Sequence, residues 1–154
     1  MMGCDRCSRQ GLWWSLAIPF IVVGIAVVIA AIAGCTDHRQ QLVQQEARAA
    51  FDHLGIEAPP VVFKFSGLPL NCDGEQIAGV TLGPVILLDA DYFPRGLTKL
   101  DCGQRSVVRH ECVHCWQGMR VGYGNWILWY ALHREAAEDE AYAVQNAFLR
   151  ECRK

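Results

Sequence analysis

The sequence lacks any stripe of Lys and Arg residues, and its aromatic residues are not interleaved with basic ones. The 154 residues carry a formal net charge of −2. A nucleic-acid-binding surface needs concentrated positive charge, so this class of function is excluded. Internal repeats and low-complexity tracts are also absent, which argues against a solenoid or a fibrous chain. We therefore expect one packed domain of about 120 residues after an apolar N-terminal segment.

The N-terminal segment predicts attachment to a membrane. Residues 1–10 contain Arg6 and Arg9, and residues 11–34 contain no charged side chain. A run of this length can cross the hydrocarbon core as a transmembrane anchor. A charged start, an apolar middle and a small-residue end are equally typical of a signal peptide. Residues 32–35 resemble the lipobox of bacterial lipoproteins, which favours lipidation of Cys35.

Both interpretations divide the chain in the same way. Residues 1–35 are the signal peptide or transmembrane anchor, and residues 36–154 are the folded domain. Because positive residues before an apolar segment stay in the cytoplasm, the domain is expected on the periplasmic or extracellular side of the cell envelope.

The eight cysteines suit a compartment in which disulfides form. Cys4 and Cys7 precede the apolar segment, and no second pair is near enough to complete a zinc cage with them. The spacing of the cysteines after Cys35 does not determine their connectivity. One or two bridges are expected, with one thiol left over. Our working hypothesis pairs Cys72 with Cys102 and Cys115 with Cys152.

Residue patterns predict an α+β fold. Apolar residues recur at helical spacing over residues 36–54, with Thr36 or Asp37 as the N-cap. Residues 61–65, 77–82 and 85–89 have the composition of strands, and Gly83 and Pro84 separate the last two. A helix is expected from Asp101 or Gln104 to Gln117, closed by Gly118, and residues 125–152 are expected to form one helix or two.

The motif with the clearest chemistry is His110-Glu111-Cys112-Val113-His114. On a helix, positions four apart share one face, so both imidazoles can be directed at one zinc ion. A third protein ligand would leave one coordination position for water, and Glu111 could act as the general base for that water. Without a third ligand, the same residues would belong to an ordinary amphipathic helix.

The third ligand is expected in the acidic stretch that follows. His110-Glu111-x-x-His114, followed by Glu138-Asp139-Glu140-Ala141-Tyr142, resembles the gluzincin branch of zinc metallopeptidases, and the compact minigluzincins are closest in size. The resemblance implies a zincin-like fold, Glu138 as the third zinc ligand and hydrolysis of peptide bonds. It covers residues 77–148. The sequence departs from the family pattern at Tyr142, where an Asp is common, and Glu135 is therefore kept as the reserve ligand.

Several other residues are candidates for the site. A metzincin would need histidine near residue 120, where this chain has Arg120, and that branch is excluded. His133 is an alternative third ligand, whereas Cys112 and Cys115 are expected to lie beside the metal. Tyr123 and Tyr130 are candidate oxyanion donors. Residues 77–89 are expected to bind extended substrate by β-addition, as the resemblance implies.

The sequence thus predicts a membrane-tethered, zinc-dependent peptidase with a peptide or protein as substrate. One alternative is an envelope lipoprotein that binds zinc or a protein partner without catalysis. Another is a structural envelope protein whose histidines bind no metal. Metal content and the effect of Glu111→Gln on turnover would separate the three.

Overall fold

The computed structural model describes residues 37–68 and 76–154, and Asp37–Lys154 form one compact unit. The apolar N-terminal segment lies outside the described residues, so the expectations made for it stay predictions. Within the described ranges, no helix combines the length and apolarity needed to span a bilayer. The unit contains helix α2 (His38–His53), strands β1 (Val62–Ser66), β2 (Gly79–Leu82) and β3 (Val85–Asp89), and helices α3 (Cys102–Val121) and α4 (Tyr123–Cys152).

The three strands form a mixed sheet in the order β1-β3-β2. β1 runs parallel to β3, with Phe63 opposite Ile86, and β2 runs antiparallel to β3, with Thr81 opposite Ile86. β3 is therefore the central strand and β2 is an edge strand. The expectation that residues 77–89 as a whole bind substrate by β-addition is wrong for residues 85–89, because these lie between the other two strands.

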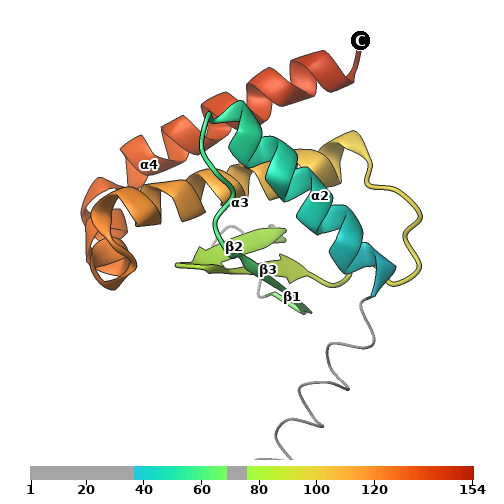
Figure 1. Ribbon diagram of the computed structural model, residues 1–154, viewed down its shortest axis with the longest axis horizontal. Coiled ribbons are helices and arrows are strands. Elements are labelled where there is room, and N and C mark those ends of the chain that lie inside the picture. Colours follow the sequence, from blue (N-terminus) through green and yellow to red (C-terminus); the bar gives the residue numbers. More distant parts are fainter. Residues whose placement is uncertain (1–36, 69–75) are drawn as a thin grey trace, which may run out of the picture. The chain divides into compact units, whose positions relative to one another are not determined.

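Helices α2 and α3 pack against the sheet, and α4 packs along α3, as Figure 1 shows. Successive side chains of a strand point to opposite faces, and the buried set contains alternate residues of β3. Phe51 of α2, Phe63 of β1, Ile86 and Leu88 of β3, and Val108 of α3 belong to one buried cluster. The predicted α+β class with a small mixed sheet is confirmed.

Helix α3 begins at a capping box and continues past the expected end. The Asp101 side chain accepts from the backbone N–H of Gln104 at 2.7 Å, and the Gln104 side chain accepts from the Asp101 N–H at 3.0 Å. Gly118 does not close the helix. A Cβ at this position would lie 3.1 Å from the Tyr123 ring, so glycine gives the space for close packing. The turn comes at Gly122, whose φ is +80°.

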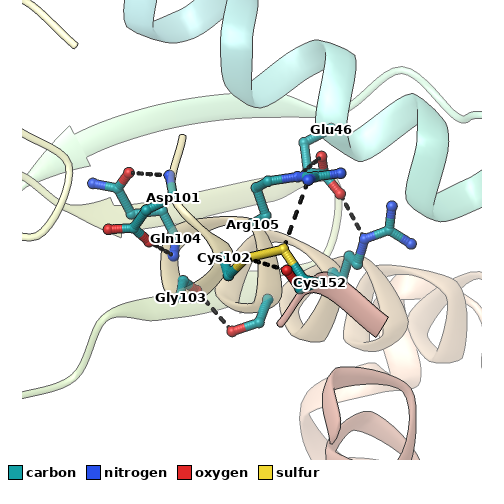
Figure 2. Close-up of polar contacts among 9 residues, drawn as sticks. Glu46, Asp101, Cys102, Gly103, Gln104, Arg105 and Cys152 are labelled. Atoms are coloured by element: carbon teal, nitrogen blue, oxygen red, sulfur yellow. Dashed lines mark hydrogen bonds and ion pairs between the residues drawn. A yellow bond between two sulfur atoms is a disulfide. The ribbon is translucent and has the colours of Figure 1, made fainter. Parts of the chain in front are cut away.

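Helix α4 is one element with a kink. His133 has φ −126° and ψ 25°, outside the helical region, between the apolar first part and the acidic second part. α4 packs along α3, and a disulfide between Cys102 and Cys152 joins the start of α3 to the end of α4. Figure 2 shows this bond beside the ion pair of Arg105 with Glu46.

The proposed cysteine pairs are both wrong. Cys152 bonds to Cys102, while Cys112 and Cys115 are free and buried. Cys115 lies near the other end of α3 and faces the Tyr123 hydroxyl at 3.4 Å. The packing of α4 along α3 brings the two helix ends together, and sequence spacing alone does not contain that information.

Candidate metal centre

A cleft of about 710 Å³ lies between the edge strand and the last two helices. β2 lines one side, α3 contributes Val107, His110, Glu111 and His114, and α4 contributes the opposite side. The three defining residues of the His-Glu-x-x-His motif, His110, Glu111 and His114, therefore all line the cleft.

Three side chains converge in this cleft. Nε2 of His110 lies 3.1 Å from Nε2 of His114, and the Glu138 carboxylate oxygens lie 3.4 Å from His110 Nε2 and 3.5 Å from His114 Nε2. Zinc bound tetrahedrally at about 2.0–2.1 Å requires ligand atoms about 3.3 Å apart. The two Glu138 distances come from different oxygens of its carboxylate. With one ligand atom taken from each residue, the three atoms lie within 4.8 Å of one another, so these residues could hold a metal ion.

The convergence follows from helix geometry. His110 and His114 are one turn apart on the same face of α3. Glu138 is on the second part of α4, beyond the kink at His133, where α4 passes along that face. Glu135 is exposed and is not part of the group, so the structure does not support Glu135 as the third ligand.

His114 is held in the tautomer that metal binding needs. Its Nδ1 lies 2.9 Å from Oε1 of Gln117, while the Gln117 amide nitrogen donates to the carbonyl oxygen of Ala137 and to Oε2 of Glu140. Both partners of that nitrogen are acceptors, which fixes the orientation of the amide. His114 Nδ1 is then the donor, and the lone pair of neutral His114 is on Nε2, facing the other two groups. Nδ1 of His110 has no hydrogen-bond partner among the described residues.

Glu138 is fixed by a donor on its own helix. The Tyr130 hydroxyl donates to Oε1 of Glu138. Burial and this hydrogen bond raise the pKa of Tyr130 to about 12, so the hydroxyl remains a donor at neutral pH. In the metal-free protein, contacts with the His110 and His114 imidazoles hold the pKa of Glu138 well below its usual range, against the opposing effect of burial. The carboxylate is therefore ionised, as a metal ligand must be.

Glu111 is in the cleft but is nearly enclosed. Its exposed fraction is 5%, and burial raises its pKa, although the nearby His110 and His114 oppose the rise. A raised pKa suits a group that takes up a proton and returns it near neutral pH.

The remaining predicted residues lie in different places. Tyr130 lines the cleft, whereas Tyr123 does not and packs against Gly83 and Gly118, so the structure does not support Tyr123 as an oxyanion donor. His133 is exposed, and its Nδ1 contacts the Trp129 carbonyl oxygen at 2.9 Å rather than the cluster. Tyr142 packs edge-on against His110, with ring centroids 4.8 Å apart.

Sequence reasoning missed Gln117 and Thr81. Gln117 is three residues after His114, and an amide one helical turn beyond a candidate ligand is a signal that the sequence does contain. Thr81 binds Glu111 from β2, and no sequence pattern connects the two residues. Comparisons of this chain with protein-family models, with curated proteins and with solved structures each find no match.

Proposed function

We propose that this protein is a zinc-dependent peptidase that hydrolyses peptide bonds. The observation that carries the proposal is the convergence of His110, His114 and Glu138, whose ligand atoms lie within 4.8 Å of one another, with the enclosed Glu111 carboxylate in the same cleft. Two imidazoles and one carboxylate are a donor set typical of catalytic zinc. Bound zinc would supply a Lewis acid that polarises the scissile carbonyl and lowers the pKa of water.

The residues of the chain account for the proton transfers. Glu111 takes a proton from the attacking water on one carboxylate oxygen and later delivers it to the nitrogen of the departing amine. Water adds to the carbonyl carbon, the C–N bond breaks, and the products are a carboxylic acid and an amine. This sequence needs no covalent intermediate with the protein.

The edge strand supports a peptide as the substrate. Among the described strands, β2 pairs with β3 alone, and its residues line the cleft. An extended peptide could add to the other edge through main-chain hydrogen bonds, which bind peptide with little dependence on its sequence. Leu82 and Ile127 line the cleft with exposed fractions of 51% and 75%, so apolar side chains of a peptide could be covered there.

The proposed location is the outer side of a cell-envelope membrane. The uncharged run of residues 11–34 and the lipobox-like residues 32–35 support it. Mass spectrometry of the purified protein tests it, because a chain that starts at a lipid-modified Cys35 has a distinct mass.

Zinc analysis of the full-length protein tests the metal centre. We expect about one zinc per chain in the wild type and in Glu135→Ala, and loss of zinc in Glu138→Ala. Glu135 is the matched control because it is an exposed glutamate three residues away on the same helix. A folded wild-type protein that binds no added zinc would refute the proposal.

Peptide hydrolysis by Glu111→Gln tests the reaction. The variant should keep its zinc and lose about 10²- to 10⁴-fold in kcat against a mixture of unstructured peptides. A zinc-loaded wild type that cleaves no peptide would instead identify a non-catalytic zinc-binding protein.

A further inference from the structure

Two alternate residues of the edge strand contact the proposed catalytic base. Residues i and i+2 of a strand point to the same face, and Gly79 and Thr81 both face Glu111 of α3. The Thr81 hydroxyl oxygen lies 2.8 Å from Oε2 of Glu111. Both side chains are buried, so the hydrogen bond is shielded from water.

Gly79 leaves the space that the Glu111 side chain occupies. A Cβ at this position would lie 2.8 Å from both Cγ and Oε1 of Glu111. Real Cβ atoms do not come this close to other heavy atoms, so any larger residue would displace either the carboxylate or the strand. The φ of Gly79 is not positive, so the requirement for glycine here comes from close contact and not from backbone conformation.

We propose that Thr81 and Gly79 are positioning residues for Glu111. The Thr81 hydroxyl orients the carboxylate, and Gly79, which has no side chain, leaves the space that the carboxylate occupies. The proposal rests on the proposed peptidase function. It adds a second role for β2, because the strand suited to bind substrate main chain also holds the base. A peptide paired with β2 would then lie in a fixed register with the Glu111 carboxylate.

The Thr81 hydroxyl lies close to two oxygens of Glu111. Besides Oε2, it lies 3.0 Å from the main-chain carbonyl oxygen of Glu111. Thr81 therefore contacts both the backbone and the side chain of Glu111, which suits a residue that positions the carboxylate relative to helix α3.

Kinetics of Thr81→Val and Thr81→Ser test the role of the hydroxyl. Valine has the shape of threonine without the hydroxyl, and serine keeps the hydroxyl. In the zinc-loaded full-length enzyme, Thr81→Val should lower kcat about 10- to 100-fold with KM and zinc content unchanged, because the base is misplaced. Thr81→Ser should stay within about threefold of the wild type, and so should Thr98→Val, which changes an exposed threonine. Wild-type kcat in Thr81→Val, or an equal loss in Thr81→Ser, would overturn the proposal.

A second measurement is independent of turnover. In metal-free protein, Thr81→Val should lower the urea midpoint of unfolding, because it leaves a buried oxygen of Glu111 without its donor. The same substitution in Glu111→Leu should lower the midpoint less. Equal decreases in the two backgrounds would show that Thr81 and Glu111 are not coupled. If the wild type cleaves no peptide but Thr81→Val lowers the urea midpoint by different amounts in the two backgrounds, the proposed peptidase function is refuted. The contact between Thr81 and Glu111 is then still supported.

Gly79→Ala tests the space requirement. We expect loss of kcat with retention of zinc, because the three atoms nearest to the added Cβ all belong to the Glu111 side chain. Gly67→Ala is the matched control, since a Cβ at Gly67 would have no neighbour within 4 Å. Unchanged kcat in Gly79→Ala would contradict the packing argument.

Discussion

The side-chain oxygen of Gln117 lies 2.9 Å from Nδ1 of His114. His114 precedes Gln117 by about one turn of helix α3. Gln117 is 1% exposed, and its amide nitrogen reaches α4 at the carbonyl oxygen of Ala137, 3.0 Å away. The buried Gln117 amide thus orients the candidate ligand His114. It also joins helix α3, which carries His114, to helix α4, which carries Glu138. Polar groups behind metal ligands commonly fix the ring orientation of a histidine in this way.

Gln117→Met should weaken zinc binding about 10- to 100-fold, because His114 loses the acceptor that fixes its tautomer and ring orientation. Competition with a chromophoric chelator measures the affinity. Gln45→Met, at an exposed position of α2, is the control and should bind zinc as the wild type does. Equal affinities in the two variants would show that Gln117 has only a packing role.

Zinc should stabilise the protein more as pH rises. Burial alone would lower the pKa of His114, but hydrogen bonding to Glu138, the charge of Glu111 and the Gln117 contact outweigh it, and the pKa is raised above 6.5. In metal-free protein, the stability from protonated His114 is fully present below pH 6.5 and is lost as pH rises through the raised pKa. Protons compete with zinc for the same nitrogen, so zinc binding strengthens over that interval.

The measurement is the melting temperature with zinc and with chelator at several pH values from about 6 to 8. The pKa of Glu138 is lowered, so this group stays ionised over that interval and its contribution is lost only at acid pH. A difference between the two melting temperatures that stays constant, or shrinks, as pH rises would contradict the assignment of His114 as a ligand.

Glu46→Gln should destabilise the protein by about 3–5 kcal/mol. Glu46 is 7% exposed and accepts from Nε of Arg105 at 2.7 Å and from Nε of Arg109 at 2.5 Å. Removing its charge leaves the buried Arg109 guanidinium uncompensated between α2 and α3. Urea unfolding measures the effect, and Glu57→Gln, at an exposed position, should change stability by less than about 0.5 kcal/mol. Similar values for the two variants would show that the buried pairs contribute nothing specific.

Loss of the Cys102–Cys152 disulfide should lower the free energy of unfolding by about 2–4 kcal/mol, because the bond closes a long loop in the unfolded chain. The Cys102→Ser/Cys152→Ser double variant avoids a leftover thiol. Non-reducing peptide mapping of the wild type comes first and should link these two cysteines while Cys115 is recovered as a thiol. A map that links Cys115 to Cys152 would contradict the structure.

The strongest sequence signals were periodic ones. Helix α2 matches its prediction to within two residues at its start, because its apolar spacing and the Asp37 cap are local features. The α+β class followed from the same kind of pattern. The end of α3 and the continuity of α4 were harder to predict. Gly118 allows close packing with Tyr123 and does not end the helix, and no proline marks the kink at His133.

Long-range relationships were predicted less well, for a physical reason. The positions of His110 and His114 on one face follow from helix geometry. The choice of Glu138 over Glu135 depends on how α4 rotates against α3, and the family resemblance, not the spacing, favoured it. The contacts of Thr81 with Glu111 and of Cys102 with Cys152 join elements far apart in the sequence. Residue composition does not predict such contacts.

The disulfide closes residues 102–152 into a covalent ring that contains His110, His114 and Glu138. A single break of the main chain between α3 and α4, at the turn around Gly122, would therefore leave both fragments joined. The three candidate ligands could not diffuse apart after such a cut. If the protein is the extracytoplasmic peptidase proposed above, a cut by itself or by a neighbouring protease need not end its activity. The cut chain would separate into two pieces only under reducing conditions.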